Sequence, residues 1–431
     1  MESSVELLPS VPHHICRSTK GNQMGPVQTA SVLLAILLAI TSCGSGGPKF
    51  EPGPAPSEPA WSMAGGNPQR NGQSTLPGPE LGSAFTLLED YWVFDDIEAD
   101  VFSGITRHVV DDDGNIYFAS LDTIYALGSD GSARWTRNVL DDEFDAGYYM
   151  DTNCAPVIYD EKFLVFASGA EDILCMDFDG NLKWKTSLEG DGTQLIAAEG
   201  RIYATAGFSI HSLDNAGNQL WETDLGNWIS WDILPAISPD GNLLLSMDEN
   251  GFVALDTSGN ELWRYLPASP AAELASNIMY AGEMWIIPDA NGWTALSEAG
   301  ELLWQLEDET AAAGVRSAPV VDPAGQLYFL MSAEIGEHRN LVACNRDGQI
   351  QWSKDNLQGS NSKGQDLMVD ARGRIYAMYL RGVTVYSSSG DKLGAFQYLD
   401  LDWPQQFWTL SITPQNKLIV GARSAGIVGM R

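Results

Sequence analysis

Few side chains in this sequence stand at spacings that support catalysis or metal binding. Two stretches, DDDGN from Asp111 and DFDGN from Asp177, could offer carboxylates to Ca²⁺. Both lack the spaced acidic positions and the distal Glu of an EF-hand loop, and Asp and Asn favour tight turns without metal. His108, His211 and His338 are not at metal-ligand spacing, and no G-x-S-x-G motif marks a hydrolytic nucleophile. We therefore interpret the acidic stretches as turns and expect no metal site.

Cys43 is the residue whose surroundings predict a specific chemical modification. It ends the stretch ITSC, which follows an apolar run at residues 30–40, with Arg17 and Lys20 nearer the start. The run has signal-peptide length and is too short to span a bilayer. The segment resembles the bacterial lipobox, which implies cleavage before Cys43 and acylation of its thiol and new amino terminus. The alternative is an ordinary signal peptide with a chance cysteine.

This interpretation divides the chain into three parts. Residues 1–42 are expected to be a lipoprotein signal peptide, residues 43–60 the lipidated cysteine and a flexible Pro/Gly linker, and residues 61–431 the folded part. Several acyl chains give stable anchoring, which one chain does not. Gly44 follows the cysteine instead of the Asp that favours inner-membrane retention in such lipoproteins. The resemblance therefore implies an outer-membrane lipoprotein of the cell envelope.

Cys154, Cys175 and Cys344 are scattered over the rest of the chain. Since three is an odd number, at least one of them is expected to be unpaired. We interpret them as buried small hydrophobic residues, and a bridge from Cys154 to either of the others stays open.

The charge of the chain restricts its partners. Asp and Glu number 57 against 24 Lys and Arg, which gives a formal net charge of −33. Such a surface repels nucleic acid and anionic lipid headgroups. No nucleic-acid partner is expected, and the membrane is expected to be reached through the lipid anchor alone.

The elements that position these residues come from an internal repeat. Six copies of a segment such as LDTSGNELW, residues 255–263, place Gly four residues before Trp at intervals of about 40 residues. A seventh copy, YSSSGDKLG, keeps Gly390 but has Gly394 where Trp would stand. Within a copy, apolar runs alternate with turn signals such as PDGN and ENG. Four strands in about 40 residues predict one blade of a β-propeller.

The Gly and Trp of the repeat have a predicted structural role. Gly259 supplies a left-handed residue to the turn before the outermost strand, and the Trp ring is expected to be buried between neighbouring blades. The position five residues before the Gly is small in nearly every copy, which indicates tight packing. The tryptophans given this structural role are Trp92, Trp135, Trp184, Trp221, Trp263, Trp304 and Trp352.

The two ends of the chain predict how the ring closes. The C-terminal LSITPQNKLIVGARSAGIVGMR contains three strands and the N-terminal LLEDYWVFDD contains one, so together they complete a blade. The expected fold is all-β: an eight-bladed β-propeller of four-stranded antiparallel blades, the last blade closed by N- and C-terminal strands.

The repeat resembles that of the pyrroloquinoline quinone (PQQ)-like, or quinoprotein-type, β-propeller family, which ALDTSGNELW matches closely. The segment WSMAGGNPQRNGQSTLPGP, residues 61–79, is similar to the one that often opens such propellers. One branch of the family consists of PQQ-dependent dehydrogenases, with a disulfide between adjacent cysteines, a Ca²⁺ ion and an Asp base. Another consists of non-catalytic propellers, among them the lipoprotein scaffold of the outer-membrane barrel assembly machinery. This sequence has no adjacent cysteines, so no cofactor is expected, and PQQ is kept as the alternative.

The candidate binding residues are aromatic and belong to long connections between blades. With strands lettered a to d from the centre outward, b–c and d–a loops emerge at one end of the ring, the loop face. The a–b and c–d turns form the other end, the turn face. The candidates are Tyr148, Tyr149, Trp228, Trp231, Trp403, Phe407 and Trp408. Clustered exposed aromatic residues suggest a binding surface. The alternative is that these side chains fill the mouth of the central channel of the propeller or pack between blades.

These features favour a non-catalytic, envelope-anchored propeller that acts as a binding or scaffold module. Its expected partner is an envelope protein or a polysaccharide. The alternatives are a PQQ-dependent dehydrogenase-like oxidoreductase and a carbohydrate-binding propeller, because Trp and Tyr faces with carboxylates suit sugars.

Overall fold

The computed structural model describes residues 60–430 except 82–85, 88–90, 98–103, 142–143, 145–149, 151–153, 161, 169–171, 191–192, 231–232, 249–250, 268–276, 290–291, 308–316, 333–337, 359–366, 380–381, 398–406 and 423–425. Residue contacts divide the chain into residues 1–49 and residues 50–431, and all described residues belong to the second unit. No helix in the described part is long and apolar enough to cross a membrane. Cys43 and the expected signal peptide lie outside the described residues.

Four blades are formed by the first half of the described chain, each with its strands in order from the centre outward. Blade 1 contains β3 (Val109–Val110), β4 (Ile116–Ser120), β5 (Thr123–Leu127) and β6 (Ala133–Asn138). Blade 2 contains β7 (Val157–Tyr159), β8 (Phe163–Ala167), β9 (Asp172–Asp177) and β10 (Leu182–Ser187). Blade 3 contains β11 (Leu195–Ala198), β12 (Arg201–Ala206), β13 (Ser209–Leu213) and β14 (Gln219–Asp224). Blade 4 contains β15 (Ala236–Ile237), β16 (Leu243–Ser246), β17 (Phe252–Leu255) and β18 (Glu261–Tyr265).

Three further blades follow in the same order. Blade 5 contains β19 (Met279–Tyr280), β20 (Met284–Asp289), β21 (Gly292–Ser297) and β22 (Leu302–Glu307). Blade 6 contains β23 (Val320–Val321), β24 (Leu327–Ser332), β25 (His338–Cys344) and β26 (Ile350–Gln358). Blade 7 contains β27 (Leu367–Val369), β28 (Ile375–Tyr379), β29 (Gly382–Tyr386) and β30 (Lys392–Gln397).

The eighth blade joins strands from both ends of the described chain. Its inner strands are β31 (Phe407–Ile412), β32 (Leu418–Ala422) and β33 (Gly426–Met430), and its outermost strand is β2 (Tyr91–Phe94). β2 runs antiparallel to β33, with Trp92 opposite Gly429. The predicted all-β eight-bladed propeller, closed by N- and C-terminal strands, is confirmed. The sequence did not predict β1 (Thr86–Leu87), which pairs in parallel with β30 and adds a fifth strand to blade 7.

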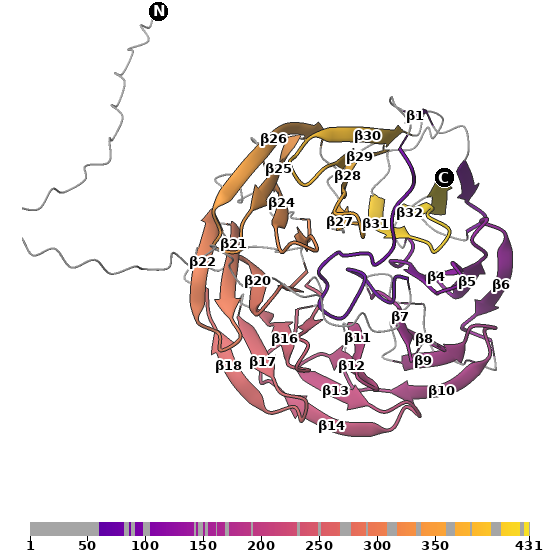
Figure 1. The fold of residues 1–431 in the computed structure, drawn as a ribbon. Helices are drawn as coiled ribbons and strands as arrows, with labels where there is room; N and C mark the ends of the chain where they lie inside the picture. Colours follow the sequence, from indigo (N-terminus) through magenta and orange to yellow (C-terminus); the bar gives the residue numbers. More distant parts are fainter. Residues whose placement is uncertain are drawn as a thin grey trace, which may run out of the picture. The chain divides into compact units, whose positions relative to one another are not determined.

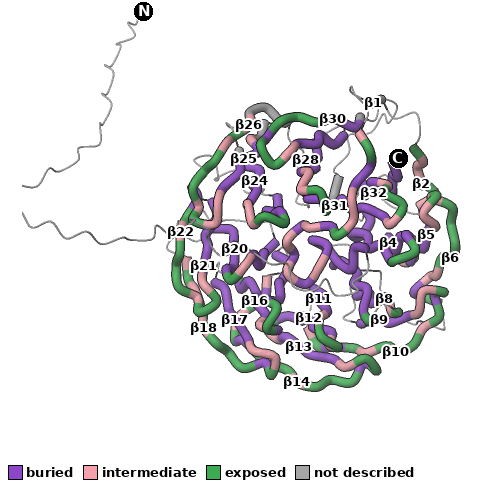
Figure 2. Tube along the Cα trace, viewed as in Figure 1, coloured by how far each residue is buried: buried purple, intermediate pink, exposed green. Residues whose placement is uncertain are grey.

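The blades follow one another around a ring (Figure 1), and burial falls from the centre outward (Figure 2). All residues of β4 are buried, whereas β14 alternates between half-buried and exposed residues after its first position. Inner strands are covered by neighbouring blades on both faces, so they are apolar throughout, while an outermost strand has solvent beside it and keeps an alternating pattern.

Each repeat tryptophan lies against a glycine turn of the next blade. A Cβ on Gly300 would lie 2.6 Å from Trp263 Cδ2, and the indole N–H of Trp263 donates to Glu298 O at 2.7 Å. The same ring-to-glycine contact is made by Trp92–Gly131, Trp135–Gly180, Trp184–Gly217, Trp221–Gly259, Trp304–Gly348 and Trp352–Gly390. The predicted small residue stands opposite the Trp on the adjacent strand, as Ala254 does for Trp263. The rings are half-buried, not buried as expected, because the outermost strand leaves part of each ring beside solvent.

The missing tryptophan of the seventh repeat copy follows from the closure. Gly394 takes the Trp position on β30, opposite Val385. The next blade is blade 8, whose β33 and β2 belong to opposite ends of the chain and share no turn. No c–d glycine turn therefore exists there to receive a ring. Leu81 approaches instead, with its Cδ2 3.5 Å from where a Cβ of Gly394 would lie.

Replacing Gly259 should cost more stability than replacing a glycine of similar backbone conformation without the ring contact. Gly259 has φ +82° and a Cβ there would lie 2.8 Å from Trp221 Cε3, whereas Gly373 has φ +73° and no atom within 4 Å. We expect Gly373→Ala to lose about 1–2 kcal/mol from the left-handed backbone alone, and Gly259→Ala to lose about 1–3 kcal/mol more from overpacking. Urea unfolding measures both, and equal losses would contradict the contact.

Candidate functional site

Residues 60–81, here called the lead-in segment, cross the centre of the ring (Figure 1). Trp61 exchanges backbone hydrogen bonds of 3.0 and 2.9 Å with Val110 of blade 1. Backbone N–H groups of five more innermost strands donate to the segment: Ile158 to Ser62 O, Ile237 to Pro68 O, Tyr280 to Gln69 O, Val321 to Asn71 O and Val369 to Gly72 O. One irregular stretch of chain thus supplies backbone partners for the inner edges of blades 1, 2, 4, 5, 6 and 7.

Arg70 extends this arrangement to blade 3. Its guanidinium is buried and donates to Leu195 O at 3.0 Å, to Ala64 O at 2.5 Å and to Pro235 O. All three acceptors are neutral carbonyl oxygens. Burial, together with the positive charge of Arg107, lowers the pKa of Arg70 to about 9. Arg70 therefore joins the lead-in segment to blades 3 and 4 by hydrogen bonds.

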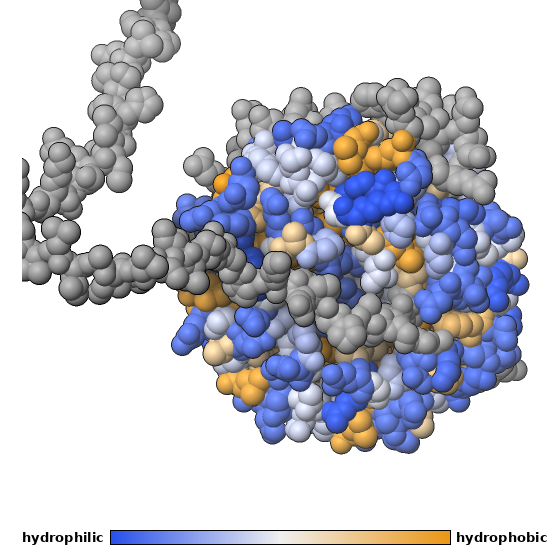
Figure 3. Space-filling view, viewed as in Figure 1, coloured by the Kyte–Doolittle hydropathy of each residue, from blue (hydrophilic) through white to orange (hydrophobic). Residues whose placement is uncertain are grey.

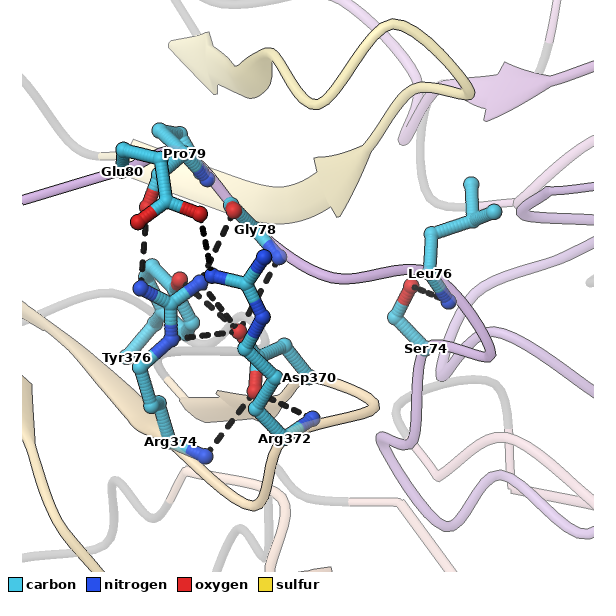
Figure 4. A network of polar contacts seen from close by, with 9 residues as sticks. All are labelled: Ser74, Leu76, Gly78, Pro79, Glu80, Asp370, Arg372, Arg374 and Tyr376. Atoms are coloured by element: carbon cyan, nitrogen blue, oxygen red, sulfur yellow. Dashed lines mark hydrogen bonds and ion pairs between the residues drawn. The ribbon is translucent and has the colours of Figure 1, made fainter.

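The end of the lead-in segment is held by a charged network on blade 7 (Figure 4). Buried Asp370 accepts from the Gly78 N–H at 3.0 Å and from Arg374 Nε at 2.7 Å. Arg374 also donates to Pro79 O and Gly78 O at 2.9 and 2.8 Å. Burial and the Asp370 charge raise the pKa of Tyr376, which donates to Asp370 Oδ2. The Asp370 carboxylate is thereby fully occupied by structural contacts.

The lead-in segment lies toward the turn face. Five of the innermost-strand residues that it contacts, including Val110 and Val369, are the last of their strands, immediately before the a–b turns. The b–c and d–a loops emerge at the opposite end.

On the loop face, Trp228 and Phe208 form an exposed aromatic pair. Their ring centroids are 4.9 Å apart at 52°, and 41% and 46% of the two residues are exposed. Phe208 follows Gly207 in the b–c turn of blade 3, and Trp228 belongs to the connection from blade 3 to blade 4. Phe208 was not predicted from the sequence, although an aromatic residue in a tight turn between two strands was a usable signal.

The backbone around this pair is fixed by hydrogen bonds. Leu225 N donates to Phe208 O and Ile229 N to Gly207 O, both at 2.9 Å, and Asp248 N donates to Trp228 O at 2.8 Å. Two exposed acidic residues lie nearby in the chain or by hydrogen bond: Asp224 is the last residue of β14, and Asp248, in the b–c turn of blade 4, is the residue that donates to Trp228 O. We call the surface formed by Phe208 and Trp228 the aromatic platform. Its rigid, exposed rings beside carboxylates suit a partner with apolar and basic groups.

The other predicted loop-face residues are placed only in part. Tyr148, Tyr149, Trp231 and Trp403 lie outside the described residues. Phe407 and Trp408 were expected in a loop, but the structure places them at the start of β31, where Phe407 pairs with Ala422. The apolar run that begins at Phe407 continues into the innermost strand, which explains the difference.

The acidic stretches form turns, as their sequence suggested. Asp111 Oδ1 accepts from Asp113 N and Asn115 N at 3.0 and 2.8 Å, and Asp177 Oδ1 makes the equivalent contacts. Burial acts against ionisation, but hydrogen bonds from Lys183 and Asn181 lower the pKa of Asp177 to about 2. Across the described residues, no three His, Cys, Asp or Glu side chains gather as metal ligands would.

The cysteines and His108 carry no exposed reactive group. Cys154, Cys175 and Cys344 are buried and unbridged, and burial raises the pKa of Cys175 and of Cys344 to about 12. Burial lowers the pKa of His108 to about 3, and its Nε2 lies 2.6 Å from Ser411 Oγ between blades 1 and 8.

Comparison with known proteins relates the chain to one family. The model of a family described as "Outer membrane protein assembly factor BamB" matches residues 206–425. A search of curated protein sequences finds no significant match. BamB from Moraxella catarrhalis superimposes with a TM-score of 0.53 and 15% identity, over 79% of this chain and 96% of that one. The quinohemoprotein alcohol dehydrogenase ADHIIG from Pseudomonas putida HK5 gives 0.62 and 13%, over 85% and 76%. At these identities the two structures show the fold alone.

Proposed function

This chain belongs to the family of the outer membrane protein assembly factor BamB, and from that premise we propose that it is a non-catalytic scaffold that binds protein partners in the cell envelope. The observation that carries the proposal is the aromatic platform of Phe208 and Trp228. Aromatic residues dominate the binding energy of protein interfaces when a partner buries them. Two rings that stay this exposed on a hydrogen-bonded backbone are prepared for such burial at little cost in entropy.

The proposal includes an outer-membrane lipid anchor at Cys43, because ITSC follows an apolar run of signal-peptide length. Replacing Cys43→Ala should move the chain from the membrane fraction to the soluble fraction of lysed cells, since acyl chains supply the attachment. Fractionation followed by immunoblotting measures this. A variant that stays in the membrane pellet as before would contradict the anchor.

The aromatic platform should be required for function in cells. We expect loss of the chain to lower the amount of folded outer-membrane barrel protein, and a Phe208→Ser, Trp228→Ser double variant to reproduce most of that loss. A photo-crosslinking residue at position 208 should join the chain to one envelope protein. The matched control is Leu393, which is also exposed but lies on β30. Neither Leu393→Ser nor a crosslinker at Leu393 should have these effects.

Two results would contradict the scaffold proposal. One is normal barrel-protein levels in the double variant when its amount and melting temperature equal those of the parent chain. The other is saturable binding of PQQ by the purified chain with oxidation of an alcohol or aldose in the presence of Ca²⁺, which would favour the dehydrogenase alternative. The proposed scaffold needs no cofactor.

A further inference from the structure

The outermost strands differ around the ring at the position just before the repeat Trp. Blades 1 and 2 carry exposed Arg134 and Lys183 there. Blades 3, 4 and 5 carry leucines that are half-exposed: Leu220 at 49%, Leu262 at 47% and Leu303 at 51%. Leu302 and Leu266 on the same rim are 52% and 77% exposed. Hydrophobic patches accordingly lie along the rim over β14, β18 and β22 (Figure 3). We call these five leucines the apolar rim.

Exposed leucines on an outermost strand need an explanation, because such strands are normally protected by charge. Sheet edges carry unpaired backbone groups, and Lys or other charges there hinder pairing with another chain. Blades 1 and 2 follow this rule, with Arg137 and Lys185 further along β6 and β10. β14, β18 and β22 end their sheets, so in the described part of the chain their outer edges have no strand beside them. Their outer edges are open, and leucine stands at the position where blades 1 and 2 carry Arg134 and Lys183.

The structure itself contains an occupied edge of this type. On blade 7, β1 lies in parallel against β30, with Thr86 opposite Phe396 and Leu87 opposite Gln397. A fifth strand can therefore be added to the outer edge of a blade in this fold. The apolar rim offers equivalent edges on three successive blades.

The charge of these strands indicates the chemistry of an occupant. Glu222, Asp224, Glu261 and Glu307 are exposed on β14, β18 and β22, against a single cation, Arg264. Arg264 is already paired with Glu261 at 2.9 Å. Leucines with carboxylates between them are complementary to a strand whose apolar residues alternate with basic ones.

We propose that the outer edges of blades 3 to 5 bind an extended polypeptide strand of alternating apolar and basic residues by β-strand addition. Backbone hydrogen bonds to the blade edge supply affinity, and the leucines and carboxylates select the sequence. This surface is on the circumference of the ring and goes beyond the proposed function, which rests on the loop face.

A labelled eight-residue peptide of alternating Leu and Lys tests the proposal by fluorescence anisotropy with the purified full chain. We expect saturable binding that weakens with salt. The combined Leu220→Ser, Leu262→Ser, Leu303→Ser variant keeps every charge and should raise the dissociation constant at least about tenfold, because burial of three leucine contacts is lost. Leu393→Ser is the matched control: its position is equivalent, but β1 already pairs with its strand. It should change the constant less than about twofold.

A second peptide with N-methyl groups on alternate residues keeps the side chains and removes backbone donors, so it should bind at least about tenfold more weakly. Strand addition would be overturned if both peptides bound equally well, or if Leu393→Ser weakened peptide binding as much as the triple leucine variant does. The proposal would also be overturned, in favour of a lipid surface, if the chain bound zwitterionic lipid vesicles and not the peptide, and if the combined Leu220→Ser, Leu262→Ser, Leu303→Ser variant lost that vesicle binding. The Phe208→Ser, Trp228→Ser variant should bind the peptide normally, so failure of one proposal is distinguishable from failure of the other.

Discussion

Truncation after Thr409 should abolish the folded ring. It removes β32, β33 and half of β31, and with them the strand to which β2 is paired. The deletion takes away eight large buried side chains: Leu410, Ile412, Leu418, Ile419, Val420, Ile427, Val428 and Met430. At about 1.5–3 kcal/mol for each, their loss amounts to about 12–24 kcal/mol, which is as large as or larger than the net stability of about 5–15 kcal/mol typical of a folded domain.

The truncated chain is expected to aggregate, because the facing surfaces of blades 1 and 7 and the edge of β2 lose their cover. Size-exclusion chromatography and thermal melting followed by circular dichroism measure the effect. A chain that lacks residues 1–42 is the control; it loses more residues but none of the described ring, and should melt as the parent does. A monomeric truncated chain with an unchanged melting temperature would refute closure by the terminal strands.

Replacing Arg70→Met should lower the free energy of unfolding by about 3–5 kcal/mol. The change leaves the carbonyl oxygens of Ala64, Leu195 and Pro235 buried without their donor, at about 1–3 kcal/mol for each unsatisfied group. Part of this loss of stability is offset, because the substitution also removes a buried charge. The lowered pKa of Arg70 indicates that burying this charge is unfavourable.

A matched control for Arg70 is Arg372→Met. Arg372 also joins the lead-in segment to a blade, through Glu80 at 2.6 Å, but both side chains are exposed. An exposed ion pair contributes about 0–1 kcal/mol. Urea unfolding of the two variants should therefore differ by at least about 2 kcal/mol. Similar losses of unfolding free energy in the two variants would mean that the hydrogen bonds of Arg70 to blades 3 and 4 do not stabilise the ring.

The candidate site was accessible to sequence reasoning only through Trp228. The alternation of strands with turns placed this residue in a long connection at the loop face, but it left open whether the ring is exposed or packed away. Its partner Phe208 lies 20 positions earlier in a short turn, and only the folding of blade 3 brings the two rings to 4.9 Å. Phe407 was misplaced because a strand boundary next to an aromatic run is poorly marked in sequence.

The sequence by itself determined the blades and their number, because each blade is a meander of consecutive strands and its turns contain Gly, Asn and Asp. Gly259 and Trp263 belong to one such unit, so their spacing was visible without a structure. The ends of the chain also revealed the split blade, because an incomplete repeat at each end has one complementary solution.

Tertiary structure alone decided which residues meet across units. Trp263 contacts Gly300 of the next copy, and Arg70 reaches Pro235 across 165 positions. The absence of Trp at Gly394 acquired its reason only when blade 8 proved to lack a turn. The exposure of Leu220, Leu262 and Leu303 could not be predicted from the sequence either. Alternation in the sequence shows that a strand has two faces, but it does not show which face is left open to solvent in the folded ring.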